Sequence, residues 1–284
     1  MTPLNALLVE HIKLQVAFAL EEDLGTGDIT AQLIPQDQEI IARVISREPT
    51  ILCGQPWVNE VFSQLGSQVK LEWHNNEGDS LEPNKPFLTI KGNARTILTG
   101  ERTALNFLQT LTYTATITHQ YSQIVAGTQL TILDTRKTLP GMRQAQKYAV
   151  TIGGGQNHRM GLYDAFLIKE NHIMAAGSIS NAVSMAQSIA PGKTIEVETE
   201  NLAEVAMAVN AGADIIMLDN FSYEDMAKAV SDFKGQVKFE ASGNMDKEKL
   251  LRVAKTGVDF VSIGALTKHI QAIDLSLRVS QEIS

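Results

Sequence analysis

The stretch Leu130-Thr-Ile-Leu-Asp134-Thr-Arg-Lys137 decides the fold, because a short apolar run ends there in a charged loop before a helical pattern begins. The segment Asp164-Ala-Phe-Leu-Ile168-Lys-Glu-Asn-His172 repeats this arrangement. Between them, Gly153-Gly-Gly155 leads into Gln156-Asn-His-Arg159, which adds another cationic pair. A short apolar run followed by a polar turn and a helix is typical of a βα unit. We therefore predict two βα turns that gather cationic side chains.

Similar apolar runs alternate with helical stretches through the rest of the chain, and a glycine closes several of the helices. This compact spacing favours a closed or nearly closed parallel barrel over a doubly wound sheet. A complete barrel has eight strands, so any strand beyond the six that can be placed must lie in segments that read as loop or helix. The six predicted strands are Leu130–Asp134, Ala165–Ile168, Thr194–Glu198, Asp214–Leu218, Val237–Ala241 and Phe260–Ile263.

The part of the chain before Leu130 has a different pattern. An amphipathic helix is predicted over residues 4–20, a strand over Glu39–Arg47, a helix over Pro56–Leu65 and a strand over Val69–Trp73. A small mixed α/β domain explains these elements. Residues 94–126 again read as helical, although the polar cluster Gly100-Glu-Arg-Thr103 interrupts their apolar pattern.

The overall charge narrows the possible functions. The chain of 284 residues has 32 acidic and 24 basic side chains, for a net charge of -8. An acidic protein is a poor match for nucleic acid or an anionic membrane surface, whereas a local basic cluster within it suits a small, highly charged anion. Cys53 is the only cysteine, which excludes an internal disulfide and a cysteine-based zinc cluster. No secretion signal or apolar run of ~20 residues is found, so a cytoplasmic location is expected.

The residues that follow the predicted strands are the candidates for function, because the active sites of barrels lie at the C-terminal ends of their strands. Arginine and histidine side chains could bind carboxylates, lysines could neutralise pyrophosphate, carboxylates could hold Mg²⁺ or ribose hydroxyls, and small residues could offer backbone N–H groups to a phosphate. In chain order these candidates are Thr135, Arg136, Lys137, His158, Arg159, Lys169, Glu198, Asp219, Ser242, Gly243, Asn244, Ile263, Gly264 and Ala265.

Two other classes of protein remain open at this point. A Schiff-base aldolase would keep its nucleophile at a strand end, where Lys169 is found. Such an enzyme needs one activated lysine and one phosphate site, which leaves the other cations and the two separate carboxylates unexplained. A non-catalytic anion-binding protein would need the cations but would have no obvious use for Glu198 and Asp219.

Several ordered motifs together resemble quinolinate phosphoribosyltransferase, the decarboxylating nicotinate-nucleotide pyrophosphorylase family of NAD synthesis. The resemblance spans nearly the whole chain and begins near its start. Its motifs are Glu22-Asp-Leu-Gly-Thr-Gly-Asp28, Gly100-Glu-Arg-Thr-Ala-Leu-Asn106, Asp134-Thr-Arg-Lys-Thr138, Lys147-Tyr-Ala-Val150, Gly153-Gly-Gly155, Asn157-His-Arg159, Leu167-Ile-Lys-Glu-Asn-His172, Glu196-Val-Glu198, Met217-Leu-Asp-Asn220 and Ser242-Gly243.

The family implies an incomplete α/β barrel of about seven strands over residues 111–269. It also implies an N-terminal α/β sandwich over residues 1–110, joined by residues 270–284. The implied assembly is a homodimer in which Arg102 reaches the partner's site. The implied reaction transfers phosphoribosyl from phosphoribosyl pyrophosphate to quinolinate, with decarboxylation to nicotinate mononucleotide. Its other products are pyrophosphate and CO₂.

The family pattern also implies roles for the residues at the strand ends. It assigns Arg136, His158, Arg159 and Lys169 to the quinolinate carboxylates, and Lys137 and Lys169 to the phosphates. Glu198 and Asp219 are assigned to Mg²⁺ and the ribose, and the loops at Ser242–Asn244 and Ile263–Ala265 to the 5′-phosphate.

Two segments depart from the usual pattern of the family. Thr112-Tyr113 replaces a common Ser-Gly, and Thr151-Ile152 replaces a common Arg-Cys or Leu-Cys. Neither segment contains a motif cation, so we expect altered packing near the site without loss of activity. A relative associated with molybdenum transport shares much of the same framework and is the nearest alternative within the resemblance.

Overall fold

The computed structural model describes residues 5–66, 69–243 and 245–283 and divides the chain into two compact units. Unit 1 contains residues 1–119, 139–153 and 269–284, and unit 2 contains residues 120–138 and 154–268. The boundary expected at residue 110 falls inside helix α3 (Ala94–Ile124). Unit 1 also includes residues 139–153, which the resemblance placed in the barrel domain.

Unit 1 is built on a four-stranded antiparallel sheet with the strand order β12-β1-β5-β3. Burial alternates along β1, where Ile40, Ala42 and Val44 face the core, as expected for a strand with one buried face. β12 comes from the last described residues of the chain and pairs with β1 along its whole length. The strands are β1 (Glu39–Ser46), β3 (Val69–Trp73), β5 (Pro86–Asn93) and β12 (Leu275–Ile283), and a separate small pair is formed by β2 (Thr50–Ile51) and β4 (Ser80–Leu81).

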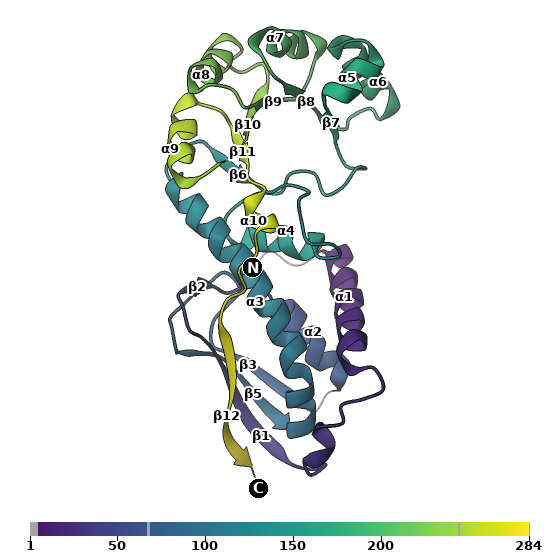
Figure 1. The fold of residues 1–284 in the computed structure, drawn as a ribbon, viewed down its shortest axis with the longest axis vertical. Helices are drawn as coiled ribbons and strands as arrows, with labels where there is room; N and C mark the ends of the chain where they lie inside the picture. The colour runs from purple at the N-terminus through teal and green to yellow at the C-terminus, as the bar shows by residue number, and fades with distance from the viewer. Residues whose placement is uncertain (1–4, 67–68, 244, 284) are drawn as a thin grey trace. The chain divides into compact units, whose positions relative to one another are not determined.

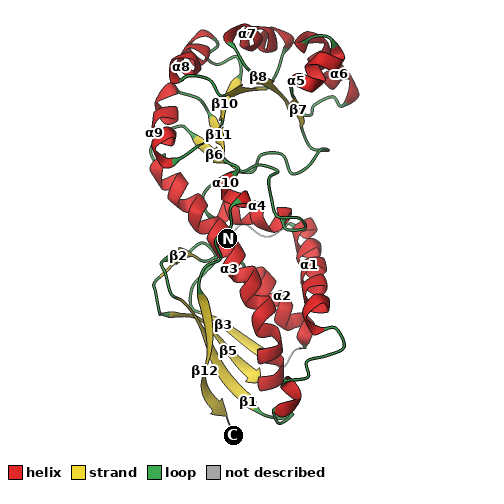
Figure 2. Ribbon diagram, viewed as in Figure 1, coloured by secondary structure: helices red, strands yellow, loops and turns green. Residues whose placement is uncertain are grey.

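The helices of unit 1 share one hydrophobic core with this sheet (Figures 1 and 2). Trp57 is fully buried at its centre and lies 5.4 Å from the ring of Tyr148. Gln15 accepts a hydrogen bond from the Trp57 indole at 2.9 Å and donates one to the Gly141 carbonyl at 2.6 Å, so a single side chain ties three segments together. The helices are α1 (Ala6–Leu24), the short 3-10 helix η1 (Ala31–Leu33), α2 (Gln55–Leu65), α3 and α4 (Arg143–Ile152).

Helix α3 runs through the polar cluster at residues 100–103 without a break. One glycine inside a helix costs only about 1 kcal/mol relative to alanine, and the position of Gly100 gives a reason for it. A Cβ there would lie 2.7 Å from Leu65 and 2.8 Å from Phe62, so the glycine lets these core side chains of α2 approach α3 closely.

Unit 2 contains a six-stranded parallel sheet with the strand order β6-β11-β10-β9-β8-β7. Figure 2 shows this sheet as an arc with helices along its outer side. A single parallel bridge between Leu133 and Gln156 extends the sheet beyond β6, at the position of a further strand. All six predicted strands are confirmed as β6 (Thr131–Leu133), β7 (Phe166–Ile168), β8 (Ile195–Thr199), β9 (Ile215–Asp219), β10 (Lys238–Ser242) and β11 (Phe260–Ser262).

In unit 2, two helices follow β7 and one helix follows each of β8, β9, β10 and β11. Ser178, Asn201, Ser222 and Asp246 cap four of them, because each side chain accepts a hydrogen bond from a backbone N–H in the first turn. The helices are α5 (Glu170–Ala176), α6 (Ile179–Ile189), α7 (Leu202–Ala211), α8 (Tyr223–Asp232), α9 (Lys247–Thr256) and α10 (Ala265–Lys268). In the described parts of the chain, no helix is long and apolar enough to cross a membrane.

Candidate functional site

Two of the predicted loops meet after strands β6 and β11. These strands pair in parallel, so the loops that follow them leave the sheet at the same edge. A Cβ on Gly264 would lie 3.1 Å from the Lys137 side chain and 3.6 Å from the Thr135 hydroxyl. Thr267 donates a hydrogen bond to the Lys137 carbonyl at 2.8 Å. Ile263 is buried and Ala265 begins α10, and Gly264 between them lies directly against the Lys137 side chain.

A second pair of strand ends is formed by β9 and β10. Asp219 and Ser242 are direct register partners on these strands. Asn220 has a positive φ of 55° and donates a hydrogen bond to the Asp219 carboxylate at 3.1 Å. Gly243 adopts a φ of 149°, which favours glycine, and a Cβ at this position would also lie 3.1 Å from the Asn220 side chain. The predicted residue Asn244 lies outside the described residues.

Strands β7 and β8 bring a predicted cation and a predicted carboxylate into contact. Lys169 follows β7, and its ammonium group forms an ion pair with the carboxylate of Glu198 on β8. The Lys169 side chain is about half exposed and that of Glu198 is mostly buried, so the lysine is the more solvent-accessible partner of the pair. A lysine paired with a carboxylate suits neutralisation of charge better than nucleophilic attack.

The two predicted arginines form a second cationic group. Burial, followed by the nearby guanidinium of Arg136, lowers the pKa of Arg159, while Glu196 and Asp164 act in the opposite direction. The Arg159 guanidinium also donates a hydrogen bond to the carbonyl of Ala165 at 3.4 Å. Two partly desolvated guanidinium groups that repel each other are stabilised when a dianion binds between them.

Two aspartates fix the loop that carries Arg159. The buried carboxylate of Asp134 accepts hydrogen bonds from the Asn157 side chain at 2.6 Å and from the backbone N–H of His158 at 3.0 Å. Asp164 accepts two more from the N–H groups of Met160 and Gly161, at 2.6 and 2.9 Å. The loop is thus held at both ends.

His158 of this loop forms a buried polar cluster with Glu196 and Glu240, and the sequence reasoning named only the histidine as a site residue. His158 Nε2 lies 2.8 Å from Glu196 Oε2 on β8 and 3.5 Å from Glu240 Oε2 on β10. Both glutamates are almost fully buried. Burial, and then the Glu196 carboxylate, raise the pKa of Glu240 to about 8, against the opposing effect of His158. The signal that could have revealed these residues is a glutamate at the centre of an otherwise apolar strand, in Ile195-Glu-Val and Phe239-Glu-Ala.

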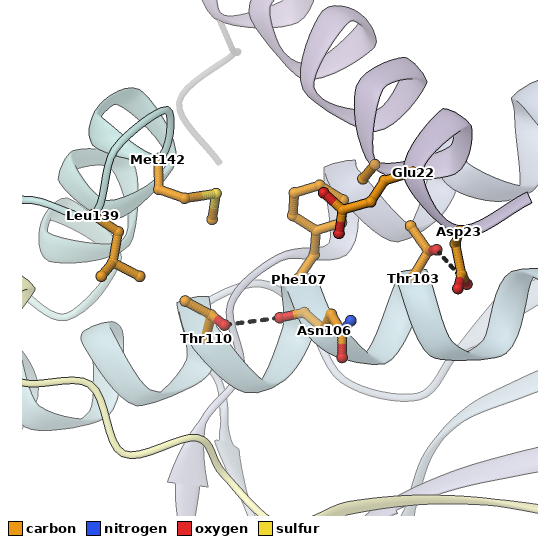
Figure 3. Close-up of a pocket in the computed structure, with 9 residues that line it drawn as sticks. Glu22, Asp23, Thr103, Asn106, Phe107, Thr110, Leu139 and Met142 are labelled. Atoms are coloured by element: carbon orange, nitrogen blue, oxygen red, sulfur yellow. Dashed lines mark hydrogen bonds between the residues drawn. The ribbon is translucent and has the colours of Figure 1, made fainter. Parts of the chain in front are cut away.

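The remaining predicted residue, Arg102, belongs to unit 1, where it is exposed on α3. Beside it, a cavity of about 250 Å³ lies between α1, α3 and the segment before α4 (Figure 3). Thr103 in its wall donates a hydrogen bond to Asp23 at 3.4 Å. The cavity is lined by Ala19, Glu22, Asp23, Thr103, Asn106, Phe107, Thr110, Leu139 and Met142.

The departure at Thr112 has a structural role in unit 1. Its buried hydroxyl accepts a hydrogen bond from the N–H of Cys53 at 3.2 Å and donates one to the carbonyl of the same residue at 3.0 Å. The second departure, at Ile152, places a methyl group 3.7 Å from where a Cβ of Gly78 would lie. Both residues therefore contribute to packing within unit 1.

Comparison with known proteins finds the same family that the sequence motifs resemble. The model described as "Quinolinate phosphoribosyl transferase, N-terminal domain" matches residues 28–112, and the model of the C-terminal domain matches residues 114–278. A Bacillus subtilis protein named "Probable nicotinate-nucleotide pyrophosphorylase (carboxylating)" is 39% identical over 260 residues, which are 91% of this chain and 90% of the relative. A Nicotiana tabacum protein named "Quinolinate phosphoribosyltransferase (decarboxylating) 1b" is 38% identical over 95% of this chain and 82% of its own length.

Solved structures agree with this result over the whole chain. The nicotinate-nucleotide pyrophosphorylase from Francisella tularensis has a TM-score of 0.93 at 50% identity, with 96% of this chain and 97% of that chain covered. A structure of NadC from Streptococcus pyogenes has a TM-score of 0.94 at 35% identity and covers both chains completely. The chain belongs to the quinolinate phosphoribosyl transferase family.

Proposed function

We propose that this enzyme transfers the phosphoribosyl group of phosphoribosyl pyrophosphate to quinolinate and releases CO₂, giving nicotinate mononucleotide and pyrophosphate for NAD biosynthesis. The observation that carries the proposal is the clustering of charge at one edge of the unit 2 sheet. Arg136, Arg159 and Lys169 supply cations there, and Glu198 and Asp219 supply carboxylates from neighbouring strands. Two polyanionic substrates need this density of positive charge.

Quinolinate carries two carboxylates, and the paired arginines suit them. Arg136 and Arg159 would each offer a planar fork of N–H donors to a carboxylate. Burial, and then the proximity of Arg136, lower the pKa of Arg159, so the paired guanidinium groups are electrostatically unfavourable without a dianion and favourable with one bound. We therefore propose that these two side chains bind the pyridine dicarboxylate, with His158 and Lys169 as further ligands.

Phosphoribosyl pyrophosphate would be held by the lysines and the small-residue loops. Lys137 lies against Gly264, so the cation and the exposed backbone of the next loop can contact the same phosphate oxygens. Lys169 would exchange its partner Glu198 for phosphate oxygens when the substrate enters. This exchange would leave the Glu198 carboxylate beside the ribose hydroxyls.

Glu198 and Asp219 fit Mg²⁺ in the chemistry of their donors, because carboxylate oxygens and retained water molecules are the ligands that Mg²⁺ prefers. Neither side chain is fully buried, so water can complete the coordination. Bound Mg²⁺ would supply positive charge beside the departing pyrophosphate. We assign Mg²⁺ to these two residues.

In the proposed reaction the ring nitrogen of quinolinate attacks C1 of the ribose while the C1–O bond to pyrophosphate breaks. The lysines stabilise the negative charge that develops on pyrophosphate. The quaternary ring nitrogen then accepts the electron pair of the C2–carboxylate bond, CO₂ leaves, and C2 takes a proton from water. No residue of the chain forms a covalent bond to the substrate.

We also propose that the enzyme acts as a homodimer in the cytoplasm, with Arg102 completing the site of the partner. Arg102 is exposed on α3, which leaves its guanidinium accessible to a second chain. The buried state of Cys53, the only cysteine of the chain, suits a compartment without disulfide formation.

The deciding experiment measures release of CO₂ and pyrophosphate with quinolinate, in parallel with nicotinate as the acceptor. Quinolinate should be preferred, and chelation of Mg²⁺ should abolish the release. A preference for nicotinate would contradict the proposal, because nicotinate lacks the second carboxylate. Borohydride treatment with substrate should leave Lys169 unmodified, whereas a reduced adduct would favour a Schiff-base aldolase.

A further inference from the structure

We propose that Asp164 is a positioning residue for quinolinate binding, because its carboxylate sets the conformation of the loop that presents Arg159. The inference rests on the proposed function, since it concerns an arginine that we propose as a quinolinate ligand. Asp164 does not touch the substrate and acts through Arg159. It is therefore expected to influence quinolinate binding and to leave the binding of phosphoribosyl pyrophosphate unaffected.

The Asp164 carboxylate closes the loop with both of its oxygens. Oδ2 accepts a hydrogen bond from the backbone N–H of Met160 at 2.6 Å, and Oδ1 accepts one from the N–H of Gly161 at 2.9 Å. Two consecutive backbone N–H groups that point at one carboxylate form a small anion-binding concavity. Because Met160 directly follows Arg159, these bonds fix the backbone beside the arginine.

The side chain of Arg159 is tied to the other end of the same loop. Its guanidinium donates a hydrogen bond to the carbonyl of Ala165 at 3.4 Å, and Ala165 directly follows Asp164. Asp164 thus closes a loop that begins at the Arg159 backbone and ends at a contact of the Arg159 guanidinium. A long side chain that is already fixed loses less conformational entropy when it binds a ligand.

The tip of the loop is not held by burial of its large side chains. Leu162 and Tyr163 are 74% and 76% exposed within the single chain. Apolar side chains that remain in water contribute little to the stability of a conformation. The hydrogen bonds to Asp164 therefore restrain the loop where side-chain packing does not.

The negative charge of Asp164 also acts on Arg159. Burial and then the Arg136 guanidinium lower the pKa of Arg159, whereas the carboxylates of Glu196 and Asp164 oppose this effect. Asp164 therefore offsets part of the repulsion between the two arginines before a dianion binds. Its position is supported by hydrogen bonds and its charge by this effect on a neighbouring cation.

An aspartate that only closes a surface loop is the competing explanation, and Asp79 provides a matched control for it. The Asp79 carboxylate accepts a hydrogen bond from the backbone N–H of Asn76 at 2.7 Å, three residues earlier in the chain. Gly161 and Asp164 have the same spacing. Asp79 belongs to unit 1 and has no proposed role in substrate binding.

The kinetic test begins with Asp164→Ala, which removes both acceptor oxygens. This variant should raise the KM for quinolinate by roughly 10- to 100-fold, as a misplaced binding group does, with the KM for phosphoribosyl pyrophosphate unchanged. Asp164→Asn keeps one acceptor oxygen and should recover part of the loss, and Asp79→Ala should leave both constants unchanged. An unchanged KM for quinolinate in Asp164→Ala, or an equal rise for both substrates, would overturn the proposal.

A double variant tests whether Asp164 acts through Arg159. If it does, adding Asp164→Ala to Arg159→Ala should raise the KM for quinolinate by no more than about 2-fold, because the residue that Asp164 positions is already gone. A further rise as large as that of Asp164→Ala alone would show that the two residues act independently. That result would also overturn the proposal.

Amide hydrogen exchange of the wild-type chain without substrates decides the matter if Asp164→Ala does not fold. The N–H groups of Met160 and Gly161 should exchange at least roughly 10-fold more slowly than free peptide N–H groups, because hydrogen bonds to charged groups are strong. Exchange of both at the free rate would overturn the proposal. This measurement does not depend on the substrate, whereas the proposed function fails separately if the wild-type chain releases no pyrophosphate with quinolinate.

Discussion

A methyl group added at Gly153 is expected to destabilise the protein, because the end of helix α4 touches the backbone of helix α3. A Cβ there would lie 2.4 Å from the Ala115 carbonyl oxygen and 2.7 Å from Thr118 Cβ, which is closer than real Cβ atoms approach a neighbour. The backbone at Gly153 has φ of -75°, so alanine meets no strain of its own. The clash is therefore the reason why Gly153→Ala should lower the free energy of unfolding.

The size of the effect follows from two opposing terms. Overpacking of this kind costs about 1–3 kcal/mol, and replacing glycine by alanine in a compatible conformation returns ~0.4–1 kcal/mol. The clash is with a backbone oxygen at 2.4 Å, so the upper part of the overpacking range, ~2–3 kcal/mol, applies. The net loss for Gly153→Ala is therefore about 1–2.6 kcal/mol, measured as a lower midpoint in urea or thermal unfolding with an unchanged denaturant slope.

Gly161→Ala is the matched control. A Cβ there would meet only ring carbons of Tyr163, as close as 2.5 Å, but this exposed ring is free to rotate away. The control should stay within ~0.5 kcal/mol of wild type. A Gly153→Ala variant as stable as wild type, or more stable, would refute the close approach of α4 to α3.

Three further predictions concern the site. Arg159→Ala should raise the KM for quinolinate by at least roughly 30-fold, since loss of a charged partner in a desolvated site costs ~2–5 kcal/mol, and a near-normal KM would contradict its assignment. Heterodimers of an Arg102→Ala chain with a chain inactivated at Lys169 should recover activity if the site is shared; failure in verified heterodimers would place Arg102 in its own subunit. The pKa of Glu240 is raised from 4.5 to about 8 in the folded chain. Between these two pH values the folded chain holds a proton that the unfolded chain has released, so the free energy of unfolding falls as the pH rises. Relative to Glu240→Gln, wild type should lose up to ~1.4 kcal/mol per pH unit across this window, and a pH-independent difference between their unfolding midpoints would argue against the shift.

The sheet of unit 2 could be predicted from the sequence because its strands are buried apolar runs with clear ends. Gly212 and Gly257 adopt positive φ values just after α7 and α9, as the glycine pattern indicated. The pairing of β12 with β1 could not be derived from local pattern, since a strand's hydrophobic alternation does not identify its partner. The continuity of α3 could not be predicted either, because Gly100 is accommodated by tertiary packing against Phe62, which the local sequence does not show.

The residues of the candidate site that lie at strand ends could be predicted from the sequence. The parallel register placed Asp219 beside Ser242, and the Lys169–Glu198 ion pair joins the ends of two neighbouring strands. The hydrogen bonding of His158 was not predictable, because it depends on the backbone geometry of one loop. Arg102 has no local signal at all, and only the family resemblance singles it out.

The pairing of β12 with β1 has a consequence for how the protein is made. During synthesis on the ribosome, residues 39–46 emerge long before residues 275–283, yet they are hydrogen-bonded to each other in the finished sheet. Until residues 275–283 have been translated, the nascent chain must carry β1 with one edge unpaired, and an unpaired edge attracts strands from other chains. Premature termination between residues 268 and 275 would therefore yield fragments that aggregate although all of unit 2 has been translated.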